Sequence, residues 1–159
     1  MPSSGKTTLG KELARHIRYR FVDTDRLIVK QEGLEISEIF AQKGENYFRE
    51  LERDILLAIR PDSKLIVSTG GGMPCFFDNM DYIKAQGISV FLNVEPESLY
   101  KRMKHNNSES RPLYQPTDEN LLQNLRQKHQ DRLPFYSRAD IVLQGNNLNV
   151  HALIEKMSQ

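Results

Sequence analysis

The chain opens with residues suited to binding phosphate, because Ser3, Ser4, Gly5, Lys6, Thr7 and Thr8 lead directly into a predicted helix. They match the second half of the pattern G-x-x-x-x-G-K-[ST]. Gly5 permits a tight turn, and the helix start adds unpaired N–H groups and a positive dipole end. Lys6 can reach the outer phosphates, and the Thr7 hydroxyl can ligate Mg²⁺. The alternative is a Gly-Lys-Thr helix start without a ligand.

Two carboxylates, Asp23 and Asp25, follow a short predicted strand at Phe21-Val22. Ligands of open α/β sheets bind beyond the carboxyl ends of the strands. Asp23 can therefore hold Mg²⁺, directly or through water, and Asp25 can accept hydrogen bonds from substrate hydroxyls and act as a base. The alternative is an acidic N-cap for the next helix, and for Asp25 both interpretations can hold together.

A run of glycines, Gly70-Gly71-Gly72, follows a second short strand, Leu65-Ile66-Val67. Residues without side chains let a ligand approach the bare backbone closely. The alternative is a flexible turn, although a flexible turn rarely needs three glycines in succession.

Arginines at positions 49, 111 and 132 could complete a site for an anion. Arg111, in a polar segment, could close over a transferring phosphate, and Arg132 could hold a substrate carboxylate in a bidentate fork. The alternatives are an exposed loop arginine for Arg111 and complementation of a helix C-terminus for Arg132. Taken alone, Arg49 is better explained as a solvated arginine that pairs with Glu45 or Glu52.

The composition is that of one ordinary globular domain, residues 1–159, with 38% hydrophobic and 27% charged residues. The net charge of +1 lacks the positive field of a nucleic-acid binder. We find no membrane span or signal peptide, and a reducing, cytoplasmic location is expected. The single cysteine, Cys75, excludes an internal disulfide, and the four histidines lack metal-ligand spacing.

The elements that must position these residues alternate between amphipathic helices and short apolar strands, which predicts an α/β fold with a parallel sheet. Further strands are predicted at 88–94 and 141–143. Helices are predicted at 6–18, 25–43 with a break at Gly33, 45–59, 78–86, 96–104 and 120–132, the last stopping near Pro134, and a short helix is predicted from Leu148. The polar segment 105–119 is expected to be a functional lid.

The first glycine of the phosphate-loop pattern, and the apolar strand that should feed the loop, would both fall before Met1. A sheet that lacks a buried strand leaves its neighbours with unpaired ladder groups, each costing about 1–3 kcal/mol if it stays buried. We therefore expect a segment upstream of Met1, or else a chain that lacks one central strand.

Taken together, the motifs resemble those of the shikimate kinase family. They are S-S-G-K-T-T-L-G-K-x-L-A, F-V-D-T-D, F-R-E-L-E, S-T-G-G-G, S-R-P-L and D-R-x-P-F-Y, and they extend from Pro2 to about Ala139. The resemblance implies a three-layer α/β/α P-loop kinase fold like that of nucleoside monophosphate kinases. Its parallel sheet would have the strand order 2-3-1-4-5, with the central strand 1 missing from this chain.

The resemblance also implies ATP- and Mg²⁺-dependent phosphorylation of the 3-hydroxyl of shikimate, in the pathway to chorismate. Lys6 and Thr7 would serve the phosphates and Mg²⁺, Asp23 the metal, and Arg111 would be the lid arginine. Lys104 would take the place of a basic residue that lies against the adenine. Shikimate would be held by Asp25, Arg49, Gly71, Gly72 and Arg132.

Other functions stay open from the residues alone. A gluconate or nucleotide kinase of the same fold would use the same phosphate loop with another acceptor. A non-catalytic shikimate kinase-like protein is also compatible with the incomplete loop. The expected partners are shikimate and ATP, without nucleic acid or membrane, and the expected state is a monomer.

Overall fold

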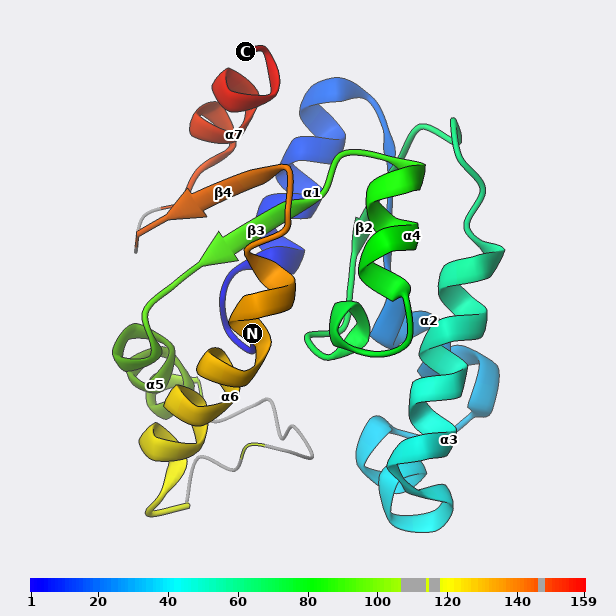
Figure 1. Cartoon of the computed structure of the whole chain (residues 1–159), viewed down its shortest axis with the longest axis vertical. Helices are drawn as coiled ribbons and strands as arrows, with labels where there is room; N and C mark the ends of the chain where they lie inside the picture. The colour runs from blue at the N-terminus through cyan, green and yellow to red at the C-terminus, as the bar shows by residue number, and fades with distance from the viewer. Residues whose placement is uncertain (107–113, 115–117, 146–147) are drawn as a thin grey trace.

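The computed structural model describes residues 1–106, 114, 118–145 and 148–159 (Figure 1). The strands are β1 (Arg20–Asp23), β2 (Leu65–Ser68), β3 (Val90–Asn93) and β4 (Ile141–Gln144). The helices are α1 (Lys6–Ile17), α2 (Thr24–Glu32), α3 (Ile36–Ala58), α4 (Asn79–Gln86), α5 (Pro96–His105), α6 (Leu121–Tyr136) and α7 (Val150–Met157), with a short 3₁₀ turn, η1, at Met73–Cys75.

The strands form two parallel pairs, which confirms the predicted α/β class. β1 pairs with β2, with Arg20 opposite Leu65, and β3 pairs with β4, with Val90 opposite Ile141. The two pairs correspond to the outer positions of the expected order, strands 2 and 3 on one side and strands 4 and 5 on the other. Within the described part of the chain, no strand links β2 to β3.

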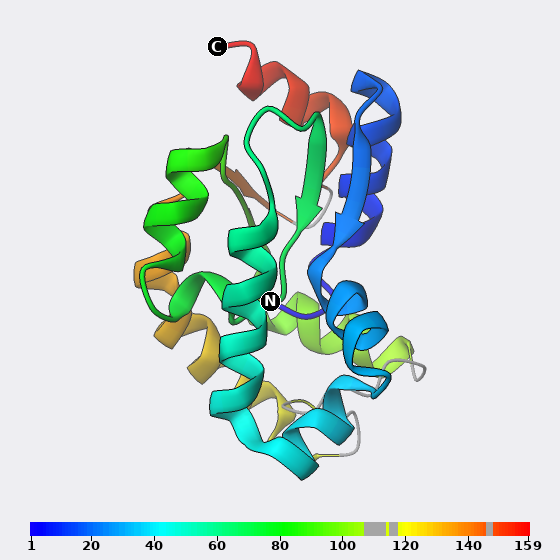
Figure 2. The same cartoon turned by 90° about the vertical axis from the view of Figure 1, so that its right-hand side faces the viewer.

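Helices cover the strands on both sides, as two perpendicular views show (Figures 1 and 2). α1 contacts β1, β2 and α7 on one side, and α4 and α6 lie on the opposite side. Buried leucines of α1 and α7 pack with Leu92 and Leu143 of the second strand pair, and a separate apolar cluster joins α2 to α3. Because the two strands of each pair are parallel, the residues that follow them lie at the same edge of the pair.

Two predicted boundaries need correction, and one division is confirmed. α6 does not end at Arg132 but continues through Pro134 to Tyr136, four residues beyond the predicted end. The predicted break at Gly33 is present, and the predicted division between residues 43 and 45 is a kink at Gly44, where φ is +85°, inside α3. β3 is shorter than the predicted strand 88–94, and Ile88 lies exposed before it.

Most of the predicted lid, including Arg111, lies outside the described residues. Among the residues that are described, no helix combines the length and apolar character that crossing a membrane requires.

Candidate active site

The phosphate loop is a tight turn that ends in the first helix. Gly5 adopts a left-handed conformation, with φ +94°, and is the N-cap of α1. The Lys6 ammonium donates to the Met1 carbonyl at 2.7 Å, and the buried Ser4 hydroxyl donates to the same oxygen at 3.0 Å. The side chain of the loop lysine is therefore folded back across the loop, above the amino end of α1.

A polar cleft of about 250 Å³ opens over this loop. Its walls bring together all six loop residues predicted from the sequence, both aspartates after β1 and the end of β2. The lining residues are Ser3, Ser4, Gly5, Lys6, Thr7, Thr8, Asp23, Asp25, Ser68, Thr69, Arg102, Met103 and Asn106. Lys104 is not among them, whereas Arg102, two residues earlier on α5, lines the cleft and donates to the Ser3 carbonyl at 3.0 Å.

Asp23 lines the cleft, and its two carboxylate oxygens contact two different helices, α1 and α2. Its Oδ2 accepts from the Thr7 hydroxyl at 3.1 Å, and its Oδ1 accepts from the backbone N–H of Asp25 at 3.0 Å, which caps α2. The capping residue is thus Asp23, and not Asp25. A hydroxyl and a carboxylate in contact are hard oxygen donors of the kind that Mg²⁺ prefers, so these residues fit that ion.

The glycine turn that follows β2 meets three groups of side chains. A methyl group added at Gly70 would lie 2.7 Å from Asp25 Oδ1 and 2.8 Å from Glu52 Oε1. One added at Gly71 would lie 2.8 Å from an Arg132 nitrogen, and one at Gly72 would lie 2.7 Å from Cζ of Arg49. These glycines are needed for the close approach of the protein's own charged side chains, in addition to any ligand.

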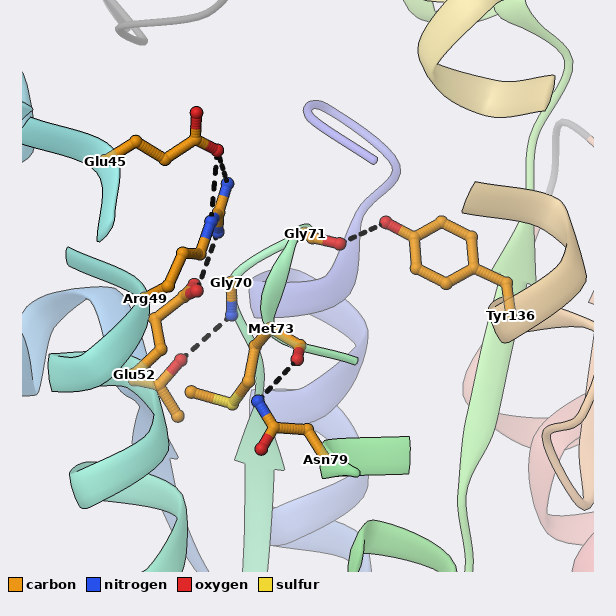
Figure 3. Close-up of polar contacts among 9 residues, drawn as sticks. Glu45, Arg49, Glu52, Gly70, Gly71, Met73, Asn79 and Tyr136 are labelled. Carbon is orange, nitrogen blue, oxygen red and sulfur yellow. Dashed lines mark hydrogen bonds and ion pairs between the residues drawn. The ribbon is translucent and has the colours of Figure 1, made fainter. Parts of the chain in front are cut away.

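Arg49 is buried, with 4% of its surface exposed, so the prediction of a solvated arginine is wrong, whereas the predicted pairing with Glu45 or Glu52 is confirmed. Its guanidinium pairs with Glu52 at 2.6 Å and with Glu45 at 3.0 Å (Figure 3), and it stacks on the Phe76 ring, 4.2 Å from the ring centroid. Burial raises the pKa of the Glu52 carboxyl to about 7; Asp25 acts in the same direction, and Arg49 opposes it. This cluster holds the guanidinium against Gly72.

Arg132 and Tyr136 approach the same turn from α6, on the opposite side from α3. The Tyr136 hydroxyl donates to the Gly71 carbonyl (Figure 3), and the two α6 side chains also hydrogen-bond with one another. Burial raises the pKa of Tyr136 above its usual value, so the hydroxyl keeps its proton and remains a donor. Four residues apart on one helix, Arg132 and Tyr136 share a face.

Two of these contributors, Tyr136 and Arg102, were not predicted from the sequence, and Glu52 was predicted only as a possible partner of Arg49. Helical spacing could have indicated two of these side chains, because Glu52 and Tyr136 each lie about one helical turn after an arginine of the site, Arg49 and Arg132. Cys75 is partly buried beside the glycine turn, and burial raises the pKa of its thiol, which favours the protonated form.

The cleft and the turn form one continuous site, because Asp25 lines the cleft and also lies against Gly70. Backbone N–H groups, Lys6 and a hard-oxygen pair suit a polyphosphate at one end. At the other end, two buried arginines suit a carboxylate, and Asp25 between the two ends suits a hydroxyl group. The arrangement can therefore place a hydroxylated acid next to a bound phosphate chain.

Comparisons with known proteins agree with this geometry. The family model described as shikimate kinase matches residues 2–159. A shikimate kinase of Bacteroides fragilis is 39% identical over 157 residues, which cover 98% of this chain and 87% of the relative. One from Clostridium botulinum is 39% identical over 147 residues, which cover 92% and 85%.

Solved structures of shikimate kinases are also similar to this chain. The shikimate kinase of Acinetobacter baumannii in complex with shikimate has a TM-score of 0.86 at 32% identity, over 98% of this chain and 86% of that one. The shikimate kinase of Bacteroides thetaiotaomicron has a TM-score of 0.81 at 32% identity, over 99% and 91%. With a family model that spans nearly its whole length and relatives of this similarity, the chain belongs to the shikimate kinase family.

Proposed function

We propose that this protein transfers a phosphoryl group from ATP to the 3-hydroxyl of shikimate, and that the residues of the described site divide this work between them. The observation that carries the assignment is the position of Asp25, which borders both the phosphate cleft and the buried arginine cluster. Shikimate combines hydroxyl groups with one carboxylate, and this combination matches the two kinds of side chain that meet at the glycine turn.

On the acceptor side, Arg49 and Arg132 would bind the carboxylate, and Gly71 and Gly72 would supply backbone against the ring. Glu52 and Tyr136 would act through these groups, Glu52 by holding the Arg49 guanidinium and Tyr136 by fixing the Gly71 carbonyl. Asp25 would accept the proton of the attacking hydroxyl and orient its oxygen, which is the usual contribution of a carboxylate in phosphoryl transfer.

On the phosphate side, Lys6 and the backbone N–H groups of residues 3–8 would hold the phosphates of ATP. Phosphoryl transfer depends mainly on positioning and on neutralising charge. Thr7 and Asp23 would hold Mg²⁺, which when bound supplies positive charge to the phosphate oxygens. Arg102 lines the cleft and would add a further cation there, while Arg111 remains a prediction for residues outside the described part.

The assignment of the acceptor is tested by a coupled assay of ADP release, with shikimate, gluconate and a nucleoside monophosphate offered separately. We expect turnover with shikimate at least 100 times that with either alternative, because only shikimate pairs a ring carboxylate with the Asp25 side of the site. Equal ADP release with and without shikimate would contradict the proposal.

Replacement of the proposed base separates chemistry from nucleotide binding. Asp25→Asn keeps the shape but removes the proton acceptor, so kcat should fall about 100-fold or more. The Kd for ATP, measured by calorimetry, should stay within about threefold of the wild-type value. Asp54→Asn, on the exposed face of α3, is the matched control. A wild-type kcat in Asp25→Asn would remove this carboxylate from the mechanism.

The space at the glycine turn can be tested with one methyl group. Gly70→Ala places a carbon within 3 Å of both Asp25 and Glu52, so kcat/KM for shikimate should fall at least tenfold. Gly87→Ala is the control, because a methyl group there meets nothing within 4 Å. The idea fails if the two variants have the same kcat/KM while circular dichroism shows both to be folded.

The buried Glu52 carboxyl should make stability depend on pH. Its folded-state pKa of about 7 lies above the usual carboxyl value of 4.5, so the folded state binds this proton more tightly. The stabilisation is complete below about pH 4.5 and is lost as pH rises to about 7. Relative to Glu52→Gln, the wild-type free energy of unfolding should fall by up to about 3 kcal/mol across this range.

Urea denaturation at several pH values measures this difference. Glu50→Gln, which removes an exposed carboxylate from the same helix, is the matched control. If the difference in unfolding free energy between the wild type and Glu52→Gln stays constant between pH 4.5 and 7, Glu52 does not titrate in this way.

A further inference from the structure

The segment that follows the glycine turn is held by a buried amide side chain to which the proposed function assigns no role. Asn79, the first residue of α4, has none of its surface exposed. Its side-chain amide donates to the Met73 carbonyl at 2.8 Å (Figure 3), and its backbone N–H donates to the Phe76 carbonyl at 3.2 Å. One residue therefore fixes both ends of the segment 73–76, which contains the η1 turn.

An arginine of α3 occupies the oxygen of this amide. The Arg53 guanidinium donates to Asn79 Oδ1 at 2.7 Å and pairs with the Asp78 carboxylate at 2.6 Å. Arg53 follows Arg49 by four residues on α3, so the two arginines share a face of the helix. The helix that brings Arg49 and Glu52 to the glycine turn thus also holds the segment after the turn, through Asn79.

The segment 73–76 and the glycine that precedes it both contact Arg49. The Phe76 ring stacks on the guanidinium, with 4.2 Å between Cζ and the ring centroid. Gly72, next to Met73, lies so close to the same group that an added Cβ would be 2.7 Å from Cζ. A shift of either end of the segment therefore changes the surroundings of the arginine that would bind the substrate carboxylate.

The amide of Asn79 is matched to its two partners. An amide donates and accepts at the same time, whereas a carboxylate could only accept and would face the Met73 carbonyl. Met73 is fully buried, so water is not available to replace the amide if it is removed. Asp78, whose side chain is 65% exposed, balances the charge of Arg53, so loss of the arginine leaves no buried charge behind.

We infer that Asn79 and Arg53 are positioning residues for the acceptor. They act on Arg49 through the segment 73–76, and they fix the orientation of its guanidinium before the acceptor binds. Neither residue lines the phosphate cleft, so their effect falls on the binding of the acceptor and not on that of ATP. This inference rests on the proposed function and extends it to residues outside the described site.

Steady-state kinetics of Arg53→Ala test this role, with Asp54→Ala, on the exposed face of α3, as the matched control. Only Arg53→Ala should raise the KM for shikimate, by about tenfold, with kcat and the Kd for ATP within about threefold of the wild-type values. Arg53→Lys, which keeps a donor for Asn79, should restore most of the wild-type KM. A purely structural role would instead reduce the folded fraction, which lowers the apparent kcat and leaves KM unchanged.

A double-variant comparison tests whether Arg53 acts through the amide. Asn79→Ala, and Asn79→Asp, which keeps the acceptor for Arg53 but loses the donor to Met73, should raise KM as Arg53→Ala does. Combining Arg53→Ala with Asn79→Ala should add no further increase, because both changes break the same connection. Single effects that multiply to about 100-fold in the double variant would overturn the inference. An unchanged KM in Arg53→Ala and Asn79→Ala would also overturn it.

Hydrogen exchange of the ligand-free chain, read by mass spectrometry, gives a result that does not depend on the acceptor. Exchange in the segment 73–79 should be at least about tenfold faster in Arg53→Ala than in Asp54→Ala, because this segment opens more often when Asn79 is not held. Faster exchange with an unchanged KM would overturn the inference, since the pair would then stabilise the segment without orienting the acceptor site. A wild-type chain without shikimate-dependent turnover would contradict the proposed function itself, a result separate from any difference between the variants.

Discussion

The absence of side chains at the turn after β2 is the constraint on which the site depends. Gly70 lies against Asp25 and Glu52, Gly71 against Arg132, and Gly72 against Arg49. A Cβ at any of these positions would lie less than 3 Å from a charged side chain, which would have to shift. β2 must therefore end at this point, and the Thr24 hydroxyl, fully buried, fixes the turn by accepting from the Gly70 N–H at 2.9 Å.

The charges around the turn are costly to bury, and this cost explains how they are arranged. A buried ion pair loses hydration that its own attraction only partly restores, and hydrogen-bonded geometry offsets the remainder. Arg49 meets this demand with two glutamates and the face of Phe76. A guanidinium held in this way has a fixed plane before any ligand arrives, which lowers the entropy lost on binding a carboxylate.

The sequence predicted a residue of the site where its role depends on neighbours in the chain, and failed where the role depends on tertiary packing. The phosphate loop, Asp23 and Asp25 were predicted because each follows or begins an element within a few residues. The burial of Arg49 was not, since it results from the packing of α3 against the distant η1 turn. Tyr136 was hidden by Pro134, which suggested an earlier helix end, and the choice between Lys104 and Arg102 depended on the rotation of α5 about its axis.

The order of the strands in the sheet could not be predicted from hydrophobic periodicity. Periodicity identified all four strands of the described residues, but it carries no information about which edges meet. The order followed from the family resemblance, and the two observed pairs agree with its outer positions.

The protonated state of Cys75 affects how this protein can be studied in solution. The residue ends the η1 turn, three residues after Gly72, and is the single cysteine of the chain. The thiolate is the form that attacks electrophilic reagents, and burial raises the pKa of the Cys75 thiol and so disfavours the thiolate. Maleimides and iodoacetamide will therefore modify the folded protein slowly, and the rate of alkylation becomes a reporter of how often the turn opens.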